Sequence, residues 1–247
     1  MTDIIRASIY RLKISKLHLY SGAVALGLGL MFCFLSKSNL AYDVSYTSIY
    51  EIIRGNIDSW VFFGFVIVMV LIVSYIGNDF KDKTIYYEVM GGHSRREVLL
   101  GRVIASGGLA WLVWTMMGCL LLCSCKEEYT ILFDEGWQLP FRVMLAVILL
   151  MPYIGVCILG AFMGRDVLKG LILTWSFYLI IQMENILIGL NNLQEDVVKY
   201  FIVKRIEYVI LHPISAGFIS SILVISILET FILMVLANTY FDKIELR

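Results

Sequence analysis

Long apolar stretches recur along this chain, with only short polar segments between them. Each stretch holds about 18 or more residues, enough for a helix rising about 1.5 Å per residue to cross about 30 Å of hydrocarbon. Since 60% of the residues are hydrophobic, such helices need lipid around them. The sequence therefore predicts an all-α integral membrane protein. We expect six transmembrane helices, at about Leu19–Ser36, Ser59–Gly77, Val103–Cys125, Pro140–Met163, Gly170–Leu190 and Pro213–Ala237.

The positive charges divide unequally between the two faces that these helices define. One face, which includes both termini, carries thirteen Lys and Arg residues. The other carries seven, including Arg142 and the expected surface cations Lys204 and Arg205. Because Lys and Arg are retained on the cytoplasmic side, both termini are expected to be cytoplasmic in a multi-pass plasma-membrane protein. The polar segments are at most about 25 residues long, too short for an independent core. A single transmembrane domain over residues 1–247 is expected.

Two segments outside the spans have amphipathic patterns. In residues 1–18, Ile5, Ile9 and Leu12 fall on one helical stripe among basic residues, which favours an interfacial helix on the inner leaflet. The alternative is a basic tail that only sets the topology. In residues 191–212, apolar residues recur at helical spacing and predict an outer amphipathic helix against the bundle, or a solvated connecting helix.

The segment 78–102, expected on the cytoplasmic side, encodes a helix, a sharp corner and a second helix. Gly91 and Gly92 form a natural helix stop, because glycine accepts the left-handed conformation. Ser94 and Glu97 then match a capping box, in which serine and glutamate side chains each accept a backbone amide. The sequence thus predicts a small rigid foot that leads into the third span.

Small residues indicate where helices approach one another. Gly160 and Gly164 form a Gly-x-x-x-Gly pattern, which permits close helix packing. Cys119 and Cys123 share a helix face, but without a histidine or a Cys-x-x-Cys pattern they are interpreted as packing residues rather than metal ligands.

Two carboxylates lie within predicted spans. A charge in hydrocarbon costs at least about 2.5 kcal/mol, so Glu184 and Glu229 are expected to face protein or a watery pathway. Gln182 and Asn185 flank Glu184 and extend this polar group. The alternative interpretation is that these side chains tie helices together by hydrogen bonds.

Signatures of enzymes and of resident cofactors are missing from the sequence. There is no Gly-x-x-x-x-Gly-Lys-[Ser/Thr] phosphate loop, no His-Glu-x-x-His zinc helix and no Gly-x-Ser-x-Gly elbow. We therefore expect neither catalytic activity nor a metal site in this chain.

The foot carries a resemblance to a known family. Asp79-Phe80, then Thr84-Ile85, then Gly92-x-Ser94-Arg95 and a cation at Arg102 resemble the first cytoplasmic loop of type-2 ABC exporter permeases. Six spans, inward termini, a basic amphipathic start and an outer helical segment before the last span are also similar to that family. The resemblance covers the whole chain in architecture and about 25 residues in motif.

The resemblance implies a permease subunit that works with separate ATPase subunits, and a bacterial origin is expected. Two ATPase copies, which bind ATP and Mg, and a second permease copy or a paired homologue are the expected partners. The foot would then be the coupling helix that sits in a groove of the ATPase. Arg95 and Arg96 would contact carboxylates of the ATPase. The coupling residues implied are Lys81, Lys83, Thr84, Ile85, Tyr86, Tyr87, Glu88, Val89, Met90, Gly91, Gly92, Arg95 and Arg96.

The expected substrate is amphipathic, with antimicrobial or toxin-like peptides favoured, and it moves outward. Two other functions remain open at the level of sequence. An ion-coupled secondary transporter would use Glu184 and Glu229 as proton carriers. A non-transporting membrane scaffold or sensor would use both glutamates only for packing.

Overall fold

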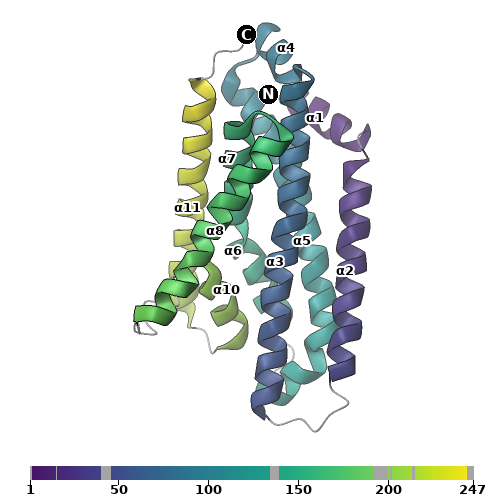
Figure 1. The fold of residues 1–247 in the computed structure, drawn as a ribbon, viewed down its shortest axis with the longest axis vertical. Coiled ribbons are helices and arrows are strands. Elements are labelled where there is room, and N and C mark those ends of the chain that lie inside the picture. Colours follow the sequence, from purple (N-terminus) through teal and green to yellow (C-terminus); the bar gives the residue numbers. More distant parts are fainter. Residues whose placement is uncertain are drawn as a thin grey trace.

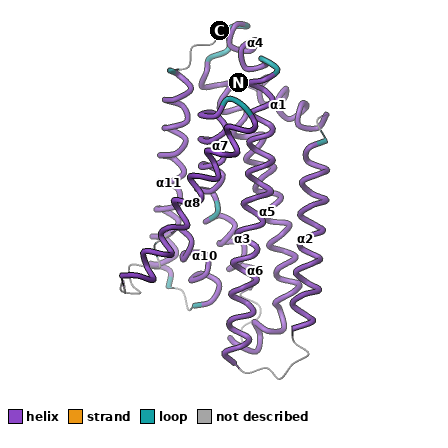
Figure 2. Tube along the Cα trace, in the orientation of Figure 1, coloured by secondary structure: helices purple, strands orange, loops and turns teal. Residues whose placement is uncertain are grey.

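The computed structural model describes the backbone of residues 2–14, 16–39, 46–133, 139–191, 200, 202–212 and 215–243. Side chains are described for residues 4–14, 16, 19–31, 51, 53–120, 140–183, 200, 202, 204–212 and 215–243. Every regular element in these ranges is an α-helix, as Figure 2 shows. The helices are α1 Thr2–Ile14, α2 Leu17–Asn39, α3 Tyr46–Lys81, α4 Thr84–Met90, α5 Arg95–Phe133, α6 Leu139–Leu149, α7 Met151–Gly164, α8 Val167–Asn191, α10 Ile202–Leu211 and α11 Ala216–Asp242.

Several of these helices are long and apolar enough to cross a membrane, as the sequence predicted. Among the described residues four segments qualify, and a fifth qualifies if α1 and α2, bent by 63°, are taken as one span. The described apolar part of α8 is shorter, so the six-span count stays a prediction. The four segments are Ile53–Lys81, Arg95–Leu120, Pro140–Gly164 and Ala216–Asp242.

The helices of the bundle differ in how deeply they are buried, and α11 lies at one edge of the bundle (Figure 1). In their most apolar windows, 83% of Pro140–Gly164 and 72% of Ile53–Lys81 is buried, against 11% of Ala216–Asp242. The centre is therefore built by α3, α6 and α7, and α11 lies at one edge. Its outward side chains are apolar, as contact with lipid requires: Val224, Ile227, Leu228, Phe231, Ile232 and Val235.

Aromatic side chains join the central helices. The rings of Phe65 in α3 and Tyr178 in α8 stack with centroids 4.2 Å apart. Tyr153 of α7 lies 5.7 Å from Phe65 and 6.3 Å from Trp114 of α5. Four helices thus meet at one ring cluster, whose edge and stacked geometries are the favourable ones for aromatic pairs.

The predicted fourth span is one apolar stretch that the backbone divides at Leu150. Pro152 stands in the first turn of α7, where its missing amide costs no hydrogen bond. The Leu150 amide is shared between the carbonyls of Ala146 at 3.2 Å and Val147 at 3.3 Å, which tightens the last turn of α6.

The Gly-x-x-x-Gly pattern lies at a close helix contact, as predicted. A Cβ atom on Gly160 would approach Thr174 Oγ1 to 2.1 Å, and one on Gly164 would approach Gly170 N to 2.3 Å. Both neighbours belong to α8. Because Gly160 and Gly164 have no side chains, α7 and α8 can pack almost backbone to backbone at these two positions.

The amphipathic stripe predicted for the N-terminal segment is not the face that packs on the bundle, and its placement on the inner leaflet stays a prediction. Ile9 is 53% exposed, whereas Ile4 and Ser8 are buried against α5. Ser8 turns inward because it accepts hydrogen bonds from two other helices. A pattern based on apolar residues alone assigns such a serine to solvent.

Replacing Gly164 by alanine should destabilise the protein, because the added Cβ meets the backbone of α8 rather than a movable side chain. Overpacking of this kind costs about 1–3 kcal/mol, so we expect a lower midpoint of thermal unfolding in detergent. Gly108→Ala is the matched control, since no atom lies within 4 Å of its added Cβ. An equal effect of both changes would contradict the close α7–α8 contact.

Candidate functional site

The predicted foot is a separate short helix, α4, and it begins later than expected. The sequence placed the body of the coupling helix at Lys81 to Met90, but Lys81 is the last residue of α3. Lys83 adopts a left-handed conformation with φ 55°. This conformation interrupts the helix between the end of α3 at Lys81 and the start of α4 at Thr84. The prediction missed this break because a lysine at positive φ has no signal comparable to a glycine.

The corner after α4 has the predicted local chemistry. Gly92 has φ 93°, and the Gly91 amide donates to Tyr87 O at 2.8 Å, which closes the helix end. The Ser94 amide donates to Glu97 Oε2 at 3.2 Å, and the Glu97 amide donates to Ser94 Oγ at 3.3 Å. This reciprocal pair is a capping box at the start of α5. Both predictions are confirmed.

Arg102 in α5 is the centre of a buried polar network behind α4. Its side chain is only 1% exposed. It forms an ion pair with Asp79 at the end of α3, and its Nη2 lies 2.8 Å from Glu88 Oε1 in α4. Its Nη1 donates to Ser8 Oγ in α1. A single guanidinium therefore contacts three other helices.

Further contacts close this network, which we call the arginine hub and define by Ser8, Arg11, Asp79, Glu88 and Arg102. Arg11 Nη1 in α1 lies 2.7 Å from Asp79 Oδ1. The hydroxyl of Tyr75 donates to the carbonyl of Ser8 at 2.8 Å. Sequence reasoning noticed Asp79 and Arg102 only as the two ends of a motif. Their opposite charges at the ends of the foot were the available signal for a pair.

One face of α4 points away from the hub. Tyr87 is 67% exposed and Met90 is 82% exposed, whereas Ile85 is fully buried. Lys83, Tyr87 and Met90 are spaced by four and three residues, so they share one helix face. We call these three residues the foot tip. The other predicted members of α4 are partly buried: Thr84, Tyr86, Glu88 and Val89.

The two arginines after the corner have different surroundings. Arg95 Nη1 donates to the carbonyls of Phe241 and Asp242 at 2.7 Å each, and so closes the C-terminal end of α11. Arg96 is exposed. The expectation that both face a partner therefore applies to Arg96, while Arg95 is engaged within the chain.

At the opposite end of the bundle, the intramembrane Glu229 is ion-paired. Arg205 of α10 is 1% exposed, and its Nη2 lies 2.7 Å from Glu229 Oε1 of α11. Arg205 also donates to Ser226 Oγ at 2.6 Å. Charge counting placed Arg205 among the surface cations, which is wrong. Arg205 is buried because it lies on the face of α10 that meets Glu229 of α11. Here Glu229 ties two helices together.

Arg142 of α6 is a second buried cation that sequence reasoning did not assign to the structure's interior. It is 6% exposed, and its Nη1 donates to three carbonyls at the C-terminal end of α10. The distances are 3.3 Å to Val209 O, 3.4 Å to Ile210 O and 2.6 Å to His212 O. A cation at a helix C-terminus also meets the negative end of the helix dipole. The predicted amphipathic helix is thus held in place against the bundle.

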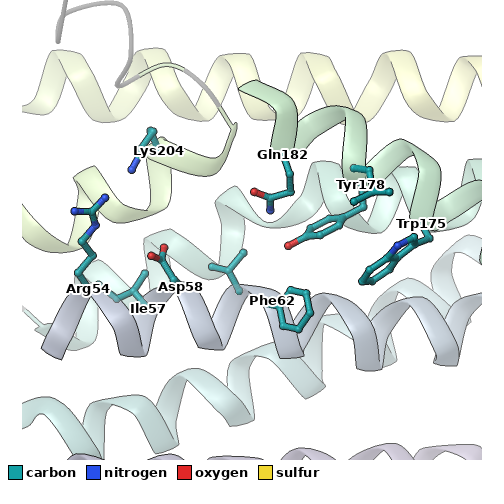
Figure 3. A pocket seen from close by; sticks show the side chains of 10 residues that line it. Arg54, Ile57, Asp58, Phe62, Trp175, Tyr178, Gln182 and Lys204 are labelled. Carbon is teal, nitrogen blue, oxygen red and sulfur yellow. The ribbon is translucent and has the colours of Figure 1, made fainter. Parts of the chain in front are cut away.

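The predicted polar group around position 184 is only partly described. The side chains of Glu184 and Asn185 lie outside the described residues. Gln182 lines a cavity of about 580 Å³ between α3, α8 and α10, and Glu229 does not line it (Figure 3). Gln182 and Glu229 therefore belong to different sites. Within the described part of the chain, no three His, Cys, Asp or Glu side chains gather as a metal site would need.

No protein-family model, curated protein or solved structure matches this chain. Functional inference consequently rests on the geometry of the foot, the arginine hub and the far end of the bundle.

The arginine hub should behave as one energetic unit. Arg102→Leu leaves Asp79 with Arg11 alone, and Asp79→Leu leaves Arg102 with Glu88 as its one remaining carboxylate; losing one partner of a buried ion pair costs up to about 3–5 kcal/mol. The double variant should lose less than the sum of the two, since both charges are gone. Denaturant titration of the purified protein measures this. Lys13→Leu, an exposed cation of α1, is the control and should have little effect. Additive losses would contradict the pairing.

Proposed function

We propose that this chain is the membrane permease subunit of an ATP-driven exporter, and that α4 is its contact with a separate ATPase subunit. The observation that carries the proposal is an exposed helix face on a rigid support. The foot tip exposes Tyr87 and Met90, while Glu88 on the other side of α4 is bonded to the buried Arg102. A helix that only connected two spans would need neither feature.

The arginine hub offers a mechanical route from the foot to the membrane helices. A displacement of α4 acts on α5 through Glu88 and Arg102, and on α3 through Asp79. It also acts on α1 through Ser8. Because these groups are buried and charged, they move together more cheaply than they separate. A rigid-body response of this kind is one of the known forms of conformational switching.

The chemistry of the foot tip indicates the surface it would fit. Tyr87 and Met90 need an apolar groove, and exposed Lys83 and Arg96 need carboxylates beside it. The ATPase that supplies such a surface would bind ATP and Mg, and two of its copies would serve two permeases. The outward direction of transport and the amphipathic peptide-like substrate follow from the family resemblance.

The ion-coupled alternative would need a carboxylate that can load and release a proton. Glu229 is 2.7 Å from the buried guanidinium of Arg205, and this ion pair between α10 and α11 favours a structural role. This observation supports the ATP-driven proposal over a carrier that works through Glu229.

The foot tip should be required for assembly with the ATPase. Met90→Asp together with Arg96→Glu should reduce recovery of the ATPase subunit by at least about tenfold, because central contacts dominate interface energies. ATP hydrolysis should be present in the wild-type complex and absent from the isolated permease. Copurification from coexpressing membranes, followed by a phosphate-release assay, measures both.

The control for this experiment is Glu51→Lys, a charge reversal at an exposed position of α3 that lies 30 residues before Lys81, about 45 Å from the foot. It should leave assembly unchanged, and both variants should elute as folded protein. Equal loss of the ATPase in the two variants would overturn the assignment of α4.

Transport should depend on nucleotide and not on a proton gradient. In vesicles with an imposed pH gradient and no ATP, we expect no movement of a labelled cationic peptide. Glu184→Gln preserves side-chain shape and hydrogen bonding, so ATP-driven export by the assembled complex should fall only modestly. Gradient-driven movement that disappears in Glu184→Gln or Glu229→Gln would favour the ion-coupled transporter instead.

A further inference from the structure

The cavity between α3, α8 and α10 has a polar end and an aromatic end (Figure 3). It encloses about 580 Å³, which is within the range of small-molecule sites. Figure 3 shows Arg54, Asp58 and Lys204 at one end, and Phe62 and Trp175 at the other. A ligand that fills such a cavity would need both a polar group and an apolar body.

The two cations at the polar end are already neutralised. Arg54 Nε lies 3.1 Å from Glu207 Oε1, and Arg54 Nη1 lies 3.8 Å from Glu51 Oε1. Lys204 Nζ lies 2.6 Å from Glu207 Oε2. Arg54 and Lys204 thus supply two positive charges, and Glu51 and Glu207 supply two negative ones.

Asp58 is the remaining charge. Its side chain lines the cavity and is exposed to it. Among the described residues it forms neither an ion pair nor a hydrogen bond. Counted over the residues whose side chains are described, the polar end therefore has one negative charge in excess, and this charge lies at a point that a ligand can reach.

The aromatic end is suited to the same kind of ligand. Trp175 and Tyr178 have ring centroids 5.6 Å apart, and Phe62 lies 6.3 Å from each of them. Clustered rings attract a cation through their negative faces, and they also cover apolar substituents. An uncompensated carboxylate beside such rings is the combination that binds ammonium-type groups.

We propose that this cavity binds a lipophilic organic cation, with its positive centre beside Asp58 and its apolar body against Phe62, Trp175 and Tyr178. An anion would meet the unpaired carboxylate of Asp58, and a neutral apolar molecule would leave that carboxylate without a partner. The proposal does not depend on an ATPase, since this chain alone forms the cavity. Failure of the foot experiments would therefore leave it intact.

The test compares two probes of matched shape and opposite charge, tetraphenylphosphonium and tetraphenylborate. Equilibrium dialysis of the full chain in dodecyl maltoside, with protein-free micelles as background, measures their binding. We expect saturable binding of tetraphenylphosphonium only. Asp58→Asn should weaken it by roughly tenfold, as loss of one charge interaction in a partly solvated site predicts. Trp175→Leu should weaken it about three- to fivefold.

Glu51→Gln is the matched control, because it removes the same charge from the same helix seven residues before Asp58, about 10 Å away. Because Glu51 does not line the cavity and acts only through its 3.8 Å pair with Arg54, this variant should weaken binding clearly less than Asp58→Asn does. Asp58 makes no contact that the fold needs, so its variant should elute like the wild type. Displacement of the phosphonium by dihexanoylphosphatidylcholine would identify a choline headgroup as the natural source of the cation, and lack of displacement would identify a free one.

Three results would overturn the proposal. The first is an absence of saturable tetraphenylphosphonium binding by the wild type. The second is binding of tetraphenylborate at least as tight, which would assign the cavity to anions through Arg54 and Lys204. The third is an equal loss of affinity in Asp58→Asn and Glu51→Gln. That result would mean that affinity depends on the net charge of this end of the bundle and not on a contact with Asp58.

Discussion

Arg102 carries a full charge on a side chain that is only 1% exposed, and the foot end of the bundle is organised around it. A guanidinium cannot lose its proton at any ordinary pH, so burial obliges the surrounding helices to supply acceptors. Asp79 supplies them from α3, Glu88 from α4 and Ser8 from α1. Separating any of these helices from α5 would expose the Arg102 guanidinium to solvent or remove one of its acceptors. The short α4, which buries little apolar surface of its own, is thereby held in one orientation.

The far end of the bundle uses the same principle with different partners. Arg205 holds α10 to α11 through Glu229, and Arg142 holds the C-terminal end of α10 to α6. Arg54 of α3 also pairs with Glu207 of α10. Between the two ends, close glycine packing and stacked rings join α3, α7 and α8. Buried cations pair helices at both ends, and apolar side chains pack densely between them. Such helices would move together as a small number of rigid bodies. Such an architecture suits a protein that transmits motion from one end to the other.

The parts of the foot that sequence reasoning predicted correctly are those decided by neighbours in the chain. The positive φ of Gly92 and the capping box of Ser94 and Glu97 involve residues at most three positions apart. The contacts that sequence reasoning missed involve distant partners. Arg205 is a surface cation by charge counting, yet it is buried because Ser226 and Glu229 lie opposite it. Ile9 belongs to an apolar stripe, yet Ser8 occupies the packing face because its hydrogen-bond partners come from α3 and α5.

The amino-acid sequence alone determined that this protein is helical, that long helices of it require lipid, and where the foot turns. Apolar length, glycine and capping chemistry are local properties, and no other part of the chain is needed to interpret them. Only the tertiary structure decided which charges are buried and with what they pair. It also decided that Asp58, which forms no ion pair or hydrogen bond within the described part of the chain, shares a cavity with three aromatic rings. The physical reason is that the cost of a buried charge depends on the groups around it in space, and residues far apart in the chain supply those groups.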